Sequence, residues 1–250
     1  MDVKKILAVA TAVVGTVAMA DIVSSSVVGY QSAELQENGL TVGACFVPVS
    51  GTTIDLTELK VTGYEAEAGT EADVQVQTLD EYGRTVKNYA FYDVPGEFTG
   101  WFDDDEVQAE VGDVVIQPGE GLWSMSTGDG FGIQSAGMVP TSSISVILQE
   151  NGLSIVNPTP VSILLSECSV GGYEAEVGTE ADVQVQTLDE YGRTVKNYAF
   201  YDVPGDFIGW FDDDEVEAID ENDVTILPGQ GLWTMSTADG FTFVFPGVTL

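Results

Sequence analysis

The chain contains the stretch YEAEAGTEADVQVQTLDEYGRTVKNYAFYDVPGEFTGWFDDDEV at residues 64–107, and contains it again, with 41 of 44 residues identical, at residues 173–216. The differing pairs are Ala68 and Val177, Glu97 and Asp206, and Thr99 and Ile208. Self-similarity of this kind indicates a duplicated structural unit. Two explanations of the near-identity stay open: a recent duplication or gene conversion, or a binding surface that the chain uses twice.

The pattern inside each copy is typical of strands and turns. Residues 72–79, ADVQVQTL, alternate apolar and polar side chains, and residues 84–92, RTVKNYAFY, follow a turn at residues 80–83, so together they predict a β-hairpin. Turn signals recur along the chain, and no long segment has helical periodicity. About eight short strands in each copy predict an all-β fold of two tandem homologous β-sandwich or barrel-like domains.

The similarity continues outside the central stretch. The segment LQENGL occurs at Leu35 and at Leu148, and PGEGLWSMSTGDGF from Pro118 returns as PGQGLWTMSTADGF from Pro228. The duplicated unit is therefore longer than the near-identical stretch, and it has diverged towards its ends.

The domain boundaries follow from these flanks. Residues 140–143, PTSS, have the composition of a linker, so we predict one domain at residues 21–140 and a second at residues 141–250. Residues 21–31, DIVSSSVVGYQ, have no clear counterpart in the second copy. They predict an extra N-terminal strand, and a strand with a free edge permits strand addition between molecules.

The first residues predict export. In residues 1–20, MDVKKILAVATAVVGTVAMA, two lysines precede an apolar stretch, and Ala18-Met19-Ala20 is a small-x-small cleavage site. This is the pattern of a cleaved signal peptide, and it is too short for a membrane span. We therefore expect a secreted or cell-surface protein with no membrane span.

The charge excludes some partners. The net charge is −34, and removal of Lys4, Lys5 and Asp2 with the signal peptide leaves 5 basic and 40 acidic residues, or −35. Such a protein repels nucleic acid phosphates and anionic lipids, so neither is an expected partner. The acidity fits a salty or calcium-containing medium, which screens the self-repulsion.

The two cysteines stand at non-equivalent positions of the repeat. Leu59 of the first copy corresponds to Cys168 of the second, and Cys45 falls near the counterpart of Pro158. In an exported protein Cys45 and Cys168 can pair, and a disulfide would then join the two domains. A buried thiol in each domain is the alternative.

Two acidic loops, each following Trp-Phe, are the candidate metal sites. Clustered carboxylates on a turn suit Ca²⁺, which takes 6–8 oxygen ligands. The spacing does not match a known calcium loop, and a solvated loop whose Asp side chains cap turn amides is the alternative. The candidate ligands are Asp103, Asp104, Asp105, Glu106, Asp212, Asp213, Asp214 and Glu215.

Repeated aromatic side chains are the candidate ligand-binding residues. Flat rings beside Asp and Asn can stack on sugar rings and bond their hydroxyls, although on strands about half of such rings belong to the core. Trp123 and Trp233 are expected to be buried. Those expected to be exposed and to contact carbohydrate are Trp101, Trp210, Tyr92 and Tyr201.

Enzymatic activity is not expected. The chain has no histidine, which removes Ser-His-Asp and Cys-His systems and His-ligated metals. Motifs of the GxSxG, P-loop and zinc types do not occur. A glycosidase with two carboxylates is formally possible, but repeats of this size are small for its cleft.

The chain resembles a group of uncharacterised secreted bacterial proteins that carry two tandem β-rich repeats and open with a VVGYQ-type segment after the signal peptide. The resemblance implies export and duplication, and it carries no activity or site residues. The stretches behind it are residues 21–31, 100–106, 209–215, 118–123 and 228–233.

Together these features favour a non-catalytic exported structural or surface protein that self-associates into an extracellular layer, matrix or filament. The alternative is an extracellular module that binds carbohydrate or calcium.

Overall fold

The computed structural model describes most of the chain after residue 27. The described residues are 28–35, 40–43, 53–63, 73–80, 82–94, 96–128, 130–150, 152–172, 182–189, 191–203, 207–214, 224–238 and 240–249. The predicted signal peptide, Cys45 and Glu215 lie outside these ranges. Among the described residues, no helix has the length and apolar character needed to cross a membrane.

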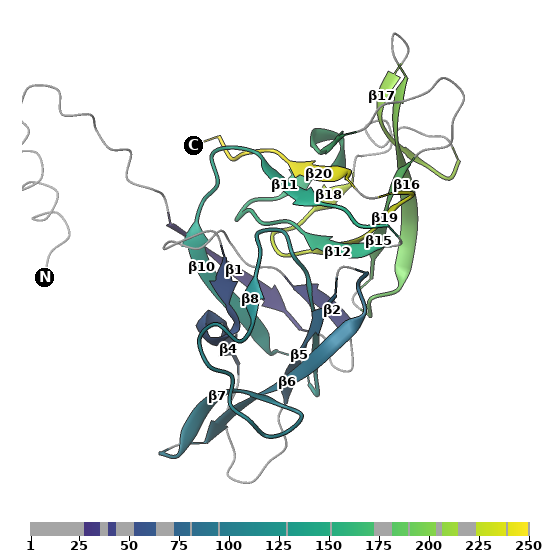
Figure 1. The fold of residues 1–250 in the computed structure, drawn as a ribbon. Helices are drawn as coiled ribbons and strands as arrows, with labels where there is room; N and C mark the ends of the chain where they lie inside the picture. Colours follow the sequence, from purple (N-terminus) through teal and green to yellow (C-terminus); the bar gives the residue numbers. More distant parts are fainter. Residues whose placement is uncertain are drawn as a thin grey trace, which may run out of the picture.

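The fold is all-β, as the strand and turn pattern predicts, and the paired strands run antiparallel (Figure 1). In the first half the described strands are β1 (Val28–Glu34), β2 (Leu40–Gly43), β3 (Ile54–Asp55), β4 (Lys60–Thr62), β5 (Val74–Leu79), β6 (Thr85–Val94), β7 (Phe98–Asp103), β8 (Val115–Ile116), β9 (Leu122–Ser126) and β10 (Gly132–Met138). A single 3-10 turn, η1 (Leu56–Glu58), follows β3.

The second half repeats this order. Its described strands are β11 (Ile144–Ile147), β12 (Leu153–Val156), β13 (Ile163–Leu164), β14 (Ser169–Gly171), β15 (Val183–Leu188), β16 (Thr194–Val203), β17 (Phe207–Asp212), β18 (Thr225–Ile226), β19 (Gly231–Ser236) and β20 (Thr242–Phe245), with η2 (Leu165–Glu167) after β13. Each half has a five-stranded sheet, β2-β9-β5-β6-β7 or β12-β19-β15-β16-β17. Each also has a three-stranded sheet, β1-β10-β4 or β11-β20-β14.

The predicted hairpin of the repeat is the pair β5–β6. Gln75 pairs with Ala90 across the two strands, and the register shifts between Thr78 and Leu79, next to the turn. The turn is closed by Asp80, whose Oδ1 accepts the backbone N–H of Tyr82 at 2.9 Å and that of Arg84 at 2.8 Å. This is the usual role of Asp in a turn.

Alternation along the strands builds a core in each half. Val74 and Val76 of β5 are fully buried, and they share one core with Ile133 of β10, so the two sheets pack face to face as in a β-sandwich. The second half has its own core around Val183 and Val185. The division into two domains at residue 140 stays a prediction.

The expectation of an unmatched N-terminal strand is wrong for the part of it that the structure describes. β1 pairs with β10 in the first half, and β11 pairs with β20 at the same place in the second half. The two segments have diverged in sequence because only their backbone pairing and the alternation of side chains need to be kept.

The two halves contact each other through β9, β19 and the loop that precedes β9. The rings of Trp123 and Trp233 lie 6.1 Å apart. The backbone N–H of Val156 donates to the carbonyl of Gly119 at 3.0 Å, which joins the loop of the first half to β12 of the second. Figure 1 shows that the β6–β7 and β16–β17 hairpins project at opposite ends of the molecule.

Candidate binding surfaces and the pocket between the halves

The expectation that Trp101 and Trp210 are exposed is wrong. Their exposed fractions are 2% and 1%. Trp101 lies edge-on to Phe91 with ring centroids 5.2 Å apart, and its Nε1 donates to the buried carbonyl of Leu59 at 3.4 Å. Because Trp101 pairs across the strands with the core residue Phe91, it faces the core as well. Neither tryptophan can stack on a sugar.

The expectation that Trp123 and Trp233 are buried in the cores is also wrong. Both are only partly buried. Trp123 alternates along β9 with the core residue Leu122, so it points to the outer face of its sheet, where it meets Trp233 of the other half. These two side chains join the halves and do not fill the core of either.

An aromatic patch lies on the outer face of each projecting hairpin. In the first half, Phe98 and Phe102 of β7 have ring centroids 5.1 Å apart, and Tyr92 of β6 lies 5.5 Å from Phe102. Phe98 is 41% exposed. In the second half, Tyr201 lies 5.6 Å from Phe211. The candidate residues Tyr92 and Tyr201 therefore belong to this outer aromatic patch.

The acidic loops begin with a side chain that is already engaged by the protein. Asp103 Oδ1 accepts the backbone N–H groups of Asp105 and Val107 at 3.0 and 2.9 Å, and its Oδ2 accepts Lys87 Nζ at 2.5 Å. The Lys87 hydrogen bond, with help from that of Val107, holds the pKa of Asp103 below its ordinary value. In the second half, Lys196 Nζ lies 2.6 Å from Asp212 Oδ2.

The remaining loop carboxylates do not converge within the described residues. Asp104 and Asp213 accept the side-chain amides of Asn88 and Asn197 at 3.3 and 3.2 Å, and the other described loop acids are exposed. No group of three His, Cys, Asp or Glu side chains is placed to hold a metal ion in the part of the chain that the structure describes. The arrangement matches the turn-capping alternative, so calcium binding stays a hypothesis.

Cys168 lies in the core of the second half. It is 3% exposed, and its Sγ lies 3.7 Å from the carbonyl oxygen of Leu164. Because Cys45 lies outside the described residues, the proposed disulfide stays a prediction.

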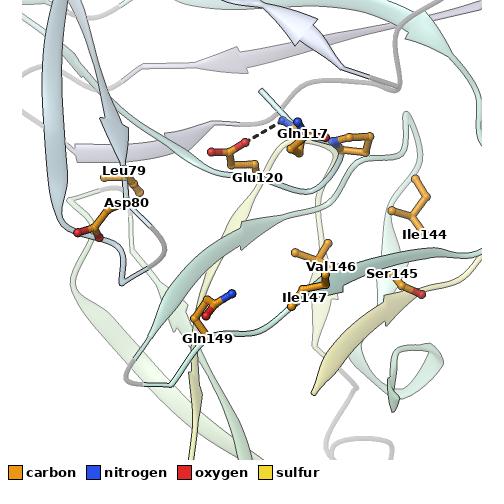
Figure 2. A pocket seen from close by; sticks show the side chains of 10 residues that line it. Leu79, Asp80, Gln117, Glu120, Ile144, Ser145, Val146, Ile147 and Gln149 are labelled. Atoms are coloured by element: carbon orange, nitrogen blue, oxygen red, sulfur yellow. Dashed lines mark hydrogen bonds between the residues drawn. The ribbon is translucent and has the colours of Figure 1, made fainter. Parts of the chain in front are cut away.

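A pocket of about 560 Å³ lies where the two halves meet (Figure 2). The first half supplies the end of β5 and the loop before β9, and the second half supplies β11 and the residues just after it. The volume is typical of small-molecule sites, which often occur at such junctions. The lining residues are Leu79, Asp80, Gln117, Pro118, Glu120, Ile144, Ser145, Val146, Ile147 and Gln149.

Glu120 supplies a half-buried carboxyl group to the lining of this pocket. Burial raises the pKa of its carboxyl group, although a hydrogen bond from the Gln117 backbone to Oε2, 2.8 Å long, opposes the change. The corresponding residue of the second half is Gln230, whose Oε1 accepts the backbone N–H of Leu227 at 2.9 Å. The turn therefore needs a side-chain acceptor at this position but does not need a negative charge.

We expect Glu120→Gln to stabilise the protein at neutral pH. Because the pKa of Glu120 is raised in the folded state, the folded chain binds this proton more tightly than the unfolded chain, and the contribution of Glu120 to stability is lost as the pH rises through the folded pKa. The advantage of the variant should shrink on acidification and vanish below about pH 4, the ordinary range of an unfolded Glu. Urea unfolding at pH 4 and pH 7 measures it.

Glu97→Gln is the matched control for this comparison, because it removes the same charge from an exposed turn. Equal stability differences for both variants at both pH values would show that only net charge matters and that the site of Glu120 has no special effect.

Sequence reasoning missed Glu120 and Phe102. The replacement of PGEG by PGQG between the copies was visible in the sequence, and it is the signal that distinguishes Glu120 from its twin. The alternation of Phe102 with Trp101 also showed that one of the two must face outwards, but not which one.

Comparison of the chain with protein families, with curated proteins and with solved structures found no match. The resemblance to secreted two-repeat proteins stays a hypothesis.

Proposed function

We propose that this protein is a non-catalytic exported structural or surface protein that self-associates into an extracellular layer, matrix or filament. The observation that carries the proposal is the outer aromatic patch, which occurs on both projecting hairpins. Export is part of the proposal and rests on the N-terminal sequence pattern.

The patch has the chemistry of an association surface. Its members in the first half, Tyr92, Phe98 and Phe102, contact one another, and Phe98 is 41% exposed on a chain of net charge −34. Aromatic residues are enriched at protein interfaces, and grouped apolar side chains on a surface mark interaction sites.

The placement of the two patches supports an open-ended assembly. A patch that pairs with a like patch on another molecule makes a symmetric contact, and such a contact closes a dimer when the molecule carries only one. The hairpins that carry the two patches project at opposite ends of the molecule (Figure 1), so each molecule can contact two others. Repetition of that contact builds a chain of molecules.

The contact is proposed to use the face of the hairpin and not strand addition at β7. The free side of β7 is bonded to the following loop, where Ala109 N–H donates to the Trp101 carbonyl at 2.8 Å and Asp103 N–H donates to the Val107 carbonyl at 3.0 Å. A covered edge is a common protection against unwanted strand pairing.

Sedimentation velocity of the chain lacking residues 1–20 tests the proposal. We expect the parent to form long assemblies that grow with salt, because screening weakens the repulsion between acidic molecules. Phe98→Asp should stop growth at dimers joined by the second-half patch. Adding Tyr201→Asp should give monomers.

Val111→Asp is the control, because Val111 is 85% exposed and lies outside the patch, and the variant should assemble like the parent. A parent that stays monomeric at high salt, with and without calcium, would refute the proposed function.

Carbohydrate binding is the second candidate function. Because Trp101 and Trp210 are buried, the residues proposed to contact a sugar are Tyr92 and Tyr201 of the outer aromatic patch. Asn88 lies on the same outer face of β6 as Tyr92, and its amide donates to Gln75 Oε1 and Asp104 Oδ1, both at 3.3 Å. A ring beside a row of amide and carboxylate groups suits a sugar. Glycan-array binding by a monomeric parent, lost on Tyr92→Ala with Tyr201→Ala, would favour this function.

A further inference from the structure

The carboxylate of Glu120 lies at the pocket between the halves among aliphatic side chains, and none of the described residues that line this pocket is basic. Figure 2 shows Glu120 and Asp80 around the same space as Val146 and Ile147. The ion pairs among the described residues are Lys87 with Asp103, Arg193 with Asp189 and Lys196 with Asp212, so none includes Glu120. A half-buried carboxylate is unfavourable unless a cation compensates it.

The second copy shows that the charge has no structural task in the turn. Glu120 and Gln230 each accept one backbone N–H from the residue three positions earlier, at 2.8 and 2.9 Å. The rest of this turn has the same Pro-Gly-x-Gly-Leu-Trp sequence in both copies. The chain therefore keeps a carboxylate at the copy that borders the pocket and an uncharged amide at its twin.

The apolar lining indicates what kind of cation fits. The aliphatic residues of the lining are Leu79 and Pro118 from the first half and Ile144, Val146 and Ile147 from the second, and they line the same pocket as the two acids. An inorganic cation would leave this surface in contact with water. A cation attached to a hydrocarbon chain would cover it and gain the free energy of apolar burial.

We propose that this pocket binds a primary amine with an aliphatic chain, whose ammonium group pairs with Glu120 and whose chain packs on the aliphatic lining that β11 supplies. Asp80 adds negative potential at the same end, although its Oδ1 is engaged by the turn amides of Tyr82 and Arg84. The strongly acidic molecule raises the local concentration of cations, which favours capture of such a ligand. This site is independent of the proposed self-association.

Titration with n-hexylamine, followed by backbone amide NMR in 150 mM salt, tests the proposal. The parent for this experiment is the chain lacking residues 1–20 with Phe98→Asp and Tyr201→Asp, which is expected to stay monomeric and whose substitutions lie outside the pocket lining. We expect saturable shifts at Ile147 and Gln149 and an affinity at least tenfold lower in Glu120→Gln. Gln230 already fills this position in the second turn, so the variant keeps the hydrogen bond that the turn needs. Hexan-1-ol, which has the chain without the charge, should bind both proteins alike and more weakly than the amine binds the parent.

Glu97→Gln is the matched charge control and should retain the affinity of the parent within twofold. Equal amine affinity in the parent and in Glu120→Gln would overturn the proposal, as would an equal loss in both variants, which would mean diffuse attraction to an acidic surface. Absence of saturable shifts in the parent at millimolar amine would also overturn it.

Discussion

Trp101→Ala is expected to lower the free energy of unfolding by about 3–5 kcal/mol, the range for removal of a large buried aromatic side chain. Trp101 is among the largest fully buried side chains of the chain, packs edge-on against Phe91, and uses its ring N–H to satisfy the Leu59 carbonyl. The substitution leaves a cavity and an unpaired buried acceptor, and both effects destabilise the folded state.

Urea unfolding followed by far-UV circular dichroism measures this effect. Val111→Ala is the control, and it should change stability by no more than about 0.5 kcal/mol because Val111 lies on the surface. Trp210→Ala should cost as much as Trp101→Ala, since Trp210 is 1% exposed and donates to the Cys168 carbonyl at 3.0 Å. An unchanged midpoint for Trp101→Ala would show that this ring is outside the core.

Gly83→Ala is expected to destabilise the protein by about 2–5 kcal/mol, the sum of a backbone term and an overpacking term. Gly83 lies in the β5–β6 turn with a φ of 72°, which disfavours any residue with a Cβ. A Cβ there would also lie 2.3 Å from Cη2 of Trp233, a rigid ring of the other half. The turn of the first half would have to move away from the second half.

Gly96→Ala separates the two effects. Gly96 has a φ of 83°, but a Cβ there would meet nothing within 4 Å, so only the backbone cost of about 1–2 kcal/mol applies. The difference between the variants in urea unfolding reports the contact between the halves. Equal costs would mean that the Gly83 turn does not depend on Trp233 in solution.

Much of the fold was predictable because the repeat makes local patterns visible twice. The alternation in ADVQVQTL and the turn-forming Asp80 and Gly83 predicted the β5–β6 hairpin, and the register of that hairpin agrees. The N-terminal strand was misjudged because strands β1 and β11 share a position in the fold without sharing a sequence. Backbone pairing accepts many side chains, so sequence comparison of the copies could not reveal the match.

The candidate sites were less predictable, because each depends on which face of a strand a side chain occupies. The sequence Trp101-Phe102 requires one ring to point inwards and one outwards, and the cross-strand partner decides the direction. The acidic loop that follows Trp101 in the sequence led to the expectation that its side chain is exposed. Asp103 is a candidate metal ligand by residue type, and only the structure shows that its oxygens bond Lys87 and the loop's own amides.

The repeated stretch at residues 64–107 by itself determined the all-β class, the hairpin and the duplication, because turn chemistry and alternation act between neighbours along the chain. Only the tertiary structure decided that Trp101 is core, that Tyr92, Phe98 and Phe102 form a surface patch, and that Glu120 borders a pocket between the halves. Those outcomes depend on the pairing of strands that are distant in sequence and on how the two halves pack. The local sequence of two nearly identical copies indicates neither which distant strands pair nor how the two halves pack.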